Sequence, residues 1–144
     1  MESLDIYPGP IIGSHVNPRA FSNTDRHLSD EAIKLMGKRD GVMGLVLLNV
    51  FWKQDWKAGE PVPISRIADA IDYICQVTGS NRHVGIGTDW YAGMGSDEYP
   101  DGLDTVADLW KIADELRTRG YSESDIDGVM SGNMLRKIAE GLPE

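Results

Sequence analysis

The feature that most constrains the fold is an almost unbroken apolar run between Gly41 and Trp52. A strand with one face in water would alternate apolar and polar residues, and this run does not alternate. Continuous apolar strands are typical of parallel sheets, which helices cover on both faces. A buried helix is the competing prediction, but Gly44 and the β-branched valines weaken it. We therefore predict a buried strand in an α/β fold.

Shorter segments on either side predict two more strands, at residues 11–15 and 83–89. The helix expected after the first strand begins at Ser29, because serine is a favoured N-cap residue and two acidic residues follow it. Gly37 or Gly41 is expected to end this helix.

Four further helices are expected along the rest of the chain. Residues 64–77 carry an apolar stripe at helical spacing, and residues 103–119 form a longer amphipathic segment. Ser122 resembles the start of a capping box and begins a short helix that ends near Gly132. Asn133 is then expected to be the N-cap of a last helix.

Strands that alternate with helices predict a parallel sheet with right-handed crossovers. The fold class is therefore α/β, with three parallel strands and about five helices. Three such units suit either a segment of an α/β barrel or a small three-layer sandwich. We expect residues 1–144 to form a single domain, with residues 1–10 as an irregular lead-in.

Composition excludes several classes of protein. A net charge of −9 disfavours binding to nucleic acid and to anionic membrane surfaces. The longest apolar run is too short to span a bilayer. The single cysteine, Cys75, excludes an internal disulfide and a cysteine-based zinc cage. Because residues 1–5 also lack the features of a signal peptide, we expect a cytoplasmic protein.

Polar residues end each predicted strand, where parallel α/β folds place their chemistry. His15 closes the first strand, Asn49 lies near the end of the second, and Asp89 closes the third. Each could merely begin a loop, but together a histidine and a carboxylate form half of a metal or acid–base site. His27 is predicted at the surface of a loop, and His83 at the opposite edge in a structural role.

Gly85 and Gly87 lie inside the third predicted strand rather than before a helix. They therefore do not form a dinucleotide-binding loop. Glycine inside a strand often marks the close approach of another group. We expect these two glycines to admit a neighbouring segment or a substrate.

Several short motifs follow one another along the chain: Ser14-His15 at a strand end, Arg26 eleven residues later, the segment at residues 83–90, and Ser-Gly-Asn-Met-Leu-Arg at residues 131–136. Their order and spacing resemble the renal (membrane) dipeptidase family, metal-dependent peptidases with a barrel of the amidohydrolase type. The similarity covers residues 10–140. It implies that the chain forms the last three β/α units of a (β/α)8 barrel.

The resemblance implies roles for individual residues. His15 would be a ligand of a two-metal centre, Arg26 would bind the substrate carboxylate, and Asp89 would orient the bridging water and pass a proton to the leaving amine. Asn49, at the same edge, is a further candidate for substrate binding. The family's complete site holds two zinc ions and hydrolyses dipeptides or similar small amides. Its other metal ligands do not occur here, so we expect zinc to be absent or weakly bound in this chain.

Two functions remain open at this point. The chain could be the C-terminal segment of a metal-dependent dipeptidase, which binds a dipeptide once the N-terminal half is supplied. It could instead be a non-catalytic truncated paralogue or fragment that folds by self-association. A helix-rich interaction module has only composition to support it. Three strands cut from a barrel leave unpaired edges and an open apolar face, so we expect a homo-oligomer.

A geometric expectation tests the barrel prediction. The three strands should be parallel and adjacent in sequence order. His15 and Asp89 should then lie at one edge, with Cα atoms on the order of 10–13 Å apart. His83 should lie at the opposite edge.

Overall fold

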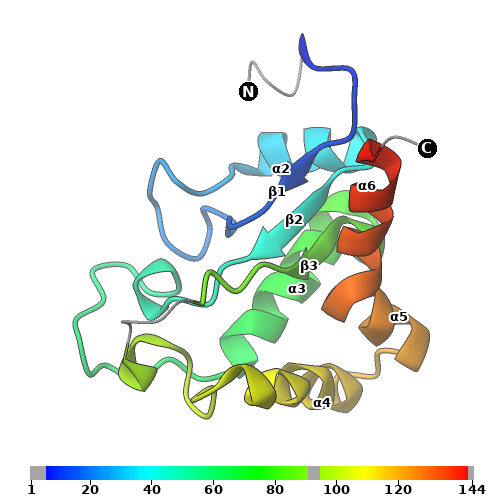
Figure 1. Cartoon of the computed structure of the whole chain (residues 1–144). Helices are drawn as coiled ribbons and strands as arrows, with labels where there is room; N and C mark the ends of the chain where they lie inside the picture. The colour runs from blue at the N-terminus through cyan, green and yellow to red at the C-terminus, as the bar shows by residue number, and fades with distance from the viewer. Residues whose placement is uncertain (1–5, 91–94, 143–144) are drawn as a thin grey trace.

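Three short parallel strands form the centre of the molecule (Figure 1). The computed structural model describes residues 6–90 and 95–142. The strands are β1 (Ile12–Gly13), β2 (Val42–Leu45) and β3 (Val84–Ile86), and they lie side by side in that order. Both neighbouring pairs are parallel, which confirms the predicted topology.

Helices make up most of the remaining regular structure. The α-helices among the described residues are α2 (Asp30–Lys38), α3 (Ser65–Thr78), α4 (Trp110–Thr118), α5 (Glu123–Asp127) and α6 (Asn133–Gly141). Short 3-10 helices are η1 (Asn49–Phe51), η2 (Asn81–His83), η3 (Ser96–Glu98) and η4 (Val106–Leu109), and η5 (Gly128–Gly132) is one π-helical turn. Within the described residues, none of these helices is both long enough and apolar enough to cross a bilayer.

The sheet is covered on both faces (Figure 1). On one face α2 approaches β1, where Met36 packs close to Gly13. On the other face α6 reaches the sheet through Met134, which lies over Gly44 and Gly85. Successive residues of a strand point to opposite sides, so these contacts place α2 and α6 on opposite faces.

The local signals for the start of α2 and the end of α3 are confirmed, whereas α2 ends at Lys38 and not at Gly37 or Gly41. The Ser29 hydroxyl accepts a hydrogen bond from the Ala32 N–H, and α2 begins at the next residue after Ser29. At the end of α3, Gly79 takes a φ of 78°, a conformation that glycine adopts without a steric cost. The buried residues of α3 include Ile67, Ile71 and Ile74, which lie on the predicted apolar stripe.

The helix predicted over residues 103–119 begins later than expected. Thr105 and Asp108 form a capping box, in which each side chain bonds to the backbone of the other residue. The first turn, η4, is a 3-10 helix, and α4 follows it directly. The capping box at Ser122 is confirmed in the same way, through reciprocal bonds with Asp125.

The predicted strand in the central apolar run is only partly confirmed. Strand β2 ends at Leu45, and the 3-10 helix η1 begins at Asn49. Asn17 accounts for the early end of the strand, because its side chain accepts from the Val46 N–H and donates to the Val46 carbonyl. A side chain thus takes the place of a neighbouring strand at that position.

The prediction that Asn133 caps a separate last helix is wrong. Gly132 has helical dihedrals, with φ −58° and ψ −40°, so the chain passes from η5 into α6 without a break. The side-chain nitrogen of Asn133 donates to the backbone carbonyls of Asn81 and Val84 instead. Asn133 therefore fastens the helix to β3 rather than starting it.

Candidate active site

His15 and the end of β3 meet at the C-terminal edge of the sheet. The exposed His15 ring places Nδ1 3.1 Å from the carbonyl oxygen of Gly87. A carbonyl can only accept, so Nδ1 is the donor in this contact. Because β1 and β3 are parallel, His15 and Asp89 end strands at the same edge, as predicted.

Two glycines allow the backbone after β1 to lie across the sheet. A methyl group at position 87 would lie 1.9 Å from the Ser14 carbonyl oxygen, and one at position 44 would lie 2.5 Å from the same oxygen. A side chain of any size is thus excluded at both positions. The expectation that Gly85 and Gly87 admit close neighbours is confirmed, since Met134 packs against Gly85.

Arg26 and Asp89 form an ion pair at this edge. The distance from Arg26 Nη2 to Asp89 Oδ2 is 3.7 Å, and the two side chains are 49% and 33% exposed. Asp89 has a φ of 54°, which is uncommon for a residue other than glycine. Strained backbone of this kind often occurs at functional sites. The structure therefore pairs Arg26 with Asp89 and holds His15 against Gly87, two residues before Asp89, at the same edge of the sheet.

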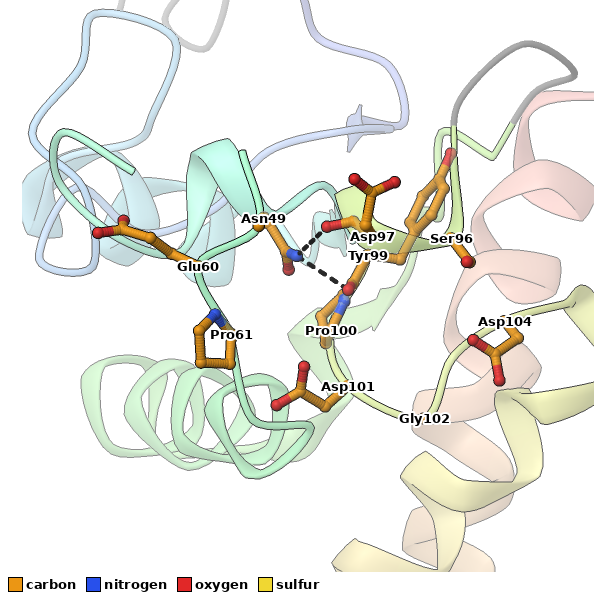
Figure 2. Close-up of a pocket in the computed structure, with 11 residues that line it drawn as sticks. Asn49, Glu60, Pro61, Ser96, Asp97, Tyr99, Pro100, Asp101, Gly102 and Asp104 are labelled. Atoms are coloured by element: carbon orange, nitrogen blue, oxygen red, sulfur yellow. Dashed lines mark hydrogen bonds between the residues drawn. The ribbon is translucent and has the colours of Figure 1, made fainter. Parts of the chain in front are cut away.

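Asn49 forms its side-chain hydrogen bonds with the loop that follows β3 (Figure 2). Its side chain is buried, and its nitrogen donates to the carbonyl oxygens of Asp97 and Tyr99 at 3.1 and 2.9 Å. Among the described residues, its hydrogen bonds go to this loop rather than to Arg26 or Asp89. A role for Asn49 in substrate binding stays a prediction.

An acidic pocket of about 290 Å³ lies beside Asn49 (Figure 2). Its carboxylates are Glu60, Asp97, Asp101 and Asp104. Carboxylates attract cations, but the described residues hold no group of three or more histidine, cysteine or acidic side chains arranged for a metal ion.

His27 is not at the surface, so that prediction is wrong. Its side chain is 2% exposed, and its Nδ1 lies 2.7 Å from the Ser22 carbonyl oxygen. Burial lowers the pKa of His27, which favours the neutral ring. The ring packs edge to face with Phe51 at a centroid distance of 5.5 Å. The position of His27 in a predicted loop did not indicate that its side chain is buried.

His83 lies at the opposite edge, as predicted. Its Nδ1 is 3.0 Å from the carbonyl oxygen of Gly41, the residue before β2. The ring therefore joins the N-terminal ends of two strands.

Phe51 is the residue near this site that the sequence patterns did not select. The guanidinium carbon of Arg26 lies 4.7 Å from the centre of the Phe51 ring. An aromatic residue at the end of an apolar run gives no indication of which side chain will pack on it. Only the fold of the intervening loop brings Arg26 over the ring.

The residues present do not by themselves fit a binuclear metal centre. A catalytic zinc ion has three protein ligands. His15 offers one nitrogen, Asp89 is paired with Arg26, and the described residues contain no cluster able to hold a metal ion. Further ligands would have to come from outside these residues.

The fold defines part of an α/β barrel. An amidohydrolase from Pseudomonas aeruginosa is 25% identical, with a TM-score of 0.83 over 96% of this chain and 48% of that chain. A metallo peptidase from Rhodobacter sphaeroides is 21% identical and has a TM-score of 0.84 over 96% of this chain and 38% of that chain. The predicted partial barrel is confirmed.

The chain belongs to the membrane dipeptidase family, peptidase family M19, which matches residues 1–141. Human dipeptidase 3 is 32% identical over 133 residues, which make up 92% of this chain and 26% of that protein. An uncharacterized protein encoded in the pqqA 5′ region of Klebsiella pneumoniae is 30% identical over 129 residues, 46% of its length. The chain thus spans between about a quarter and about half of these relatives. The family is one of metallopeptidases, which confirms the resemblance seen in the sequence.

Proposed function

We propose that this chain supplies one side of the active site of a metal-dependent dipeptidase, which hydrolyses dipeptides or similar small amides at a binuclear zinc site. The observation that carries the proposal is the ion pair of Arg26 and Asp89 at the edge of the parallel sheet where His15 contacts Gly87. Membership of the dipeptidase family supports the reaction class. The related Rhodobacter sphaeroides structure is described as liganded with a phosphinate mimic of the dipeptide L-Ala-D-Ala, which supports the substrate class.

Each residue has a role that its chemistry suits. Arg26 is half exposed, and a guanidinium can bind a carboxylate through two parallel hydrogen bonds, so it anchors the free C-terminus of the substrate. Asp89 accepts a proton and passes it to the leaving amine. His15 offers Nε2 to a metal, while the bond from its Nδ1 to Gly87 orients the ring.

The remaining parts of the site would come from the segment of the fold that this chain does not contain. Zinc bound at a completed site would supply an activated water and would polarise the scissile carbonyl. The relatives are longer than this chain, which supports a source for the further ligands. The half-buried Cys75, the single cysteine, supports a cytoplasmic location, because such compartments keep thiols reduced.

A non-catalytic role is the second candidate. It is favoured by the lack of a metal-holding cluster among the described residues. A truncated relative of this kind would fold by self-association and would not hydrolyse dipeptides in any combination.

The deciding experiment combines this chain with a separately produced N-terminal half of the barrel and measures dipeptide hydrolysis. Asp89→Asn should lower the rate by about 10²–10⁴-fold, because it removes a proton-transfer group while keeping the shape. Asp114→Asn is the matched control, since Asp114 lies on the exposed side of α4 and pairs with Arg117. An unchanged rate in Asp89→Asn would remove the role given to Asp89, and no hydrolysis in any combination would favour the non-catalytic candidate.

A further inference from the structure

The ring of Phe51 lies between two side chains of the loop that follows β1. The guanidinium of Arg26 is 4.7 Å from the ring centre, and the His27 ring packs edge to face on the same ring at 5.5 Å. Two consecutive residues of the loop, Arg26 and His27, thus contact the same aromatic ring.

The ring is held firmly enough to act as a support. The Phe51 N–H donates to the Leu48 carbonyl at 3.0 Å within η1. His27, its neighbour, is buried, and its Nδ1 contacts the Ser22 carbonyl. Asn49, in the same turn, is tied to the loop that follows β3. The backbone of Phe51 and the residues around its ring are therefore held by contacts that do not involve Arg26.

The ion pair between Arg26 and Asp89 is weaker than the contacts that hold Phe51 and its neighbours. Their 3.7 Å separation exceeds the length of a normal hydrogen bond, and both side chains reach solvent. Exposed ion pairs contribute little to stability. An arginine over an aromatic ring still presents N–H groups around the edge of its guanidinium. A ligand carboxylate that binds two of these groups can therefore replace Asp89 while the ring stays in place.

We infer that Phe51 is a positioning residue, whose ring holds the Arg26 guanidinium at the edge of the sheet so that Arg26 can exchange Asp89 for the carboxylate of a ligand. That this ligand is the C-terminus of a dipeptide rests on the proposed function. The positioning of Arg26 for a carboxylate does not depend on the proposed function. It can be measured on this chain by itself.

The chain offers a matched control. It contains two phenylalanines, and each lies beneath an arginine. Arg66 lies 4.4 Å from the centre of the Phe21 ring. Loss of the Phe21 ring therefore removes the same kind of contact without touching Arg26.

The test is nuclear magnetic resonance of the arginine side chains, with N-acetylglycine as the carboxylate probe and N-acetylglycinamide as its neutral counterpart. In the unaltered chain, the Arg26 side-chain protons should be shifted upfield by the Phe51 ring, and N-acetylglycine alone should move the Arg26 signals. Phe51→Leu and Phe51→Met should abolish the upfield shift and weaken N-acetylglycine binding by about two- to fivefold. Phe51→Tyr should retain both properties, and Phe21→Leu should leave carboxylate binding unchanged.

Three results would overturn the inference. One is equal affinity for N-acetylglycine in the unaltered chain and in a folded Phe51→Leu or Phe51→Met variant. Another is an equal response of Arg26 to the two probes. The third is no response to N-acetylglycine. If Arg26 responds as expected but dipeptide hydrolysis fails, the result counts against the proposed function only. If dipeptides are hydrolysed but Arg26 does not respond as expected, the result counts against the positioning role only.

Discussion

Gly44 and Gly87 show how single residues without side chains can shape this site. Both lie under the Ser14 carbonyl, at distances that no Cβ atom could tolerate. The Val16 N–H, two residues further on, donates to the Gly44 carbonyl at 2.9 Å. His15 lies between these two contacts, so its position depends on the absence of two side chains on other strands.

Gly87→Ala should therefore disturb both stability and the site. The added methyl group would meet a backbone oxygen, which can move only if His15 moves with it. We expect a loss of about 1–3 kcal/mol in the free energy of unfolding by urea, as for other overpacked sites. The NMR signals of the His15 ring should change at the same time. Gly141→Ala, where nothing lies within 4 Å, is the control. Full stability with an unchanged His15 signal would contradict the steric account.

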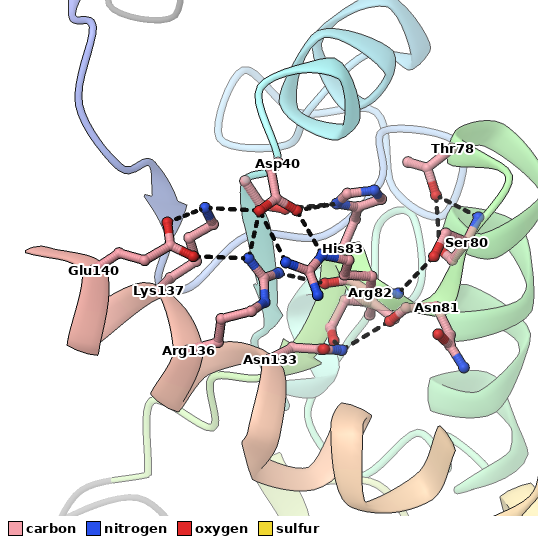
Figure 3. A network of polar contacts seen from close by, with 12 residues as sticks. Asp40, Thr78, Ser80, Asn81, Arg82, His83, Asn133, Arg136, Lys137 and Glu140 are labelled. Atoms are coloured by element: carbon pink, nitrogen blue, oxygen red, sulfur yellow. Dashed lines mark hydrogen bonds and ion pairs between the residues drawn. The ribbon is translucent and has the colours of Figure 1, made fainter. Parts of the chain in front are cut away.

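Helix α6 is held to the sheet by a polar network around Asp40 (Figure 3). Asp40 Oδ1 accepts from Arg82 Nε at 2.8 Å, and Oδ2 lies 2.7 Å from Arg136 Nη1 and 3.1 Å from Lys137 Nζ. The hydrogen bond from Arg82, followed by those of the α6 cations, holds the pKa of Asp40 well below its usual range. One carboxylate thus joins the turn before β2, η2 and α6.

The network should make the chain sensitive to acid. Because the pKa of Asp40 is lower in the folded chain than its value of about 3.9 in an unfolded one, its contribution is complete above that pH and is lost as the pH falls further. Asp40→Asn should cost about 1–2 kcal/mol at pH 7, a range that allows for the partial exposure of Asp40. Its effect at pH 3 should be smaller. Urea unfolding at both pH values tests this, with Asp114→Asn as the control. An equal loss at both pH values would be inconsistent with linkage through Asp40.

The whole molecule has open surfaces that a complete barrel would cover. Within the described residues, β1 and β3 each pair with β2 alone, so both outer edges of the sheet are free. On α6, the side chains of Leu135 and Ile138 are exposed at helical spacing, and the exposed Leu142 directly follows the helix. Free strand edges and contiguous apolar surface favour association with another chain.

We therefore expect the isolated chain to form a homo-oligomer, most simply a dimer. Light scattering across a range of concentrations should show a mass above that of one chain. Ile138→Lys should shift the population towards the monomer, because a charge would then lie on the exposed stripe of α6. Lys34→Glu, on the far side of the fold, is a charge-change control. A monodisperse monomer at high concentration would refute the expectation.

Metal content is a second property of the whole molecule. Because the described residues hold no group of three or more metal-binding side chains and His15 is the one predicted metal ligand, the isolated chain should retain less than one equivalent of zinc after dialysis. Elemental analysis provides the measurement, and His15→Ala should remove most of any residual zinc. Two equivalents per chain would mean that ligands outside the predicted set complete a site.

Much of the fold could be predicted because its signals are local. The apolar run after Gly41, the serine caps and the terminal glycines act through neighbouring residues, so the order of strands and helices could be derived from them. The edge position of His15 and Asp89 follows from the same order, because parallel strands end on one side. Gly85 and Gly87 in the third predicted strand indicated that another group lies close to the backbone there. They did not indicate that these groups are Met134 and the Ser14 carbonyl.

The tertiary structure decided what depends on residues far apart in the sequence. Asn17 ends β2 by bonding Val46, and the backbone at Ser14 crosses two glycines of other strands. His27 is buried, and Phe51 supports Arg26, because the loop after β1 folds back over the end of β2. Such contacts satisfy buried polar groups and fill space across the fold, and no local pattern of residues encodes their partners. The sequence by itself determined the family, the parallel order of the strands and the edge that carries the site, while long-range packing determined how the residues at that edge are held.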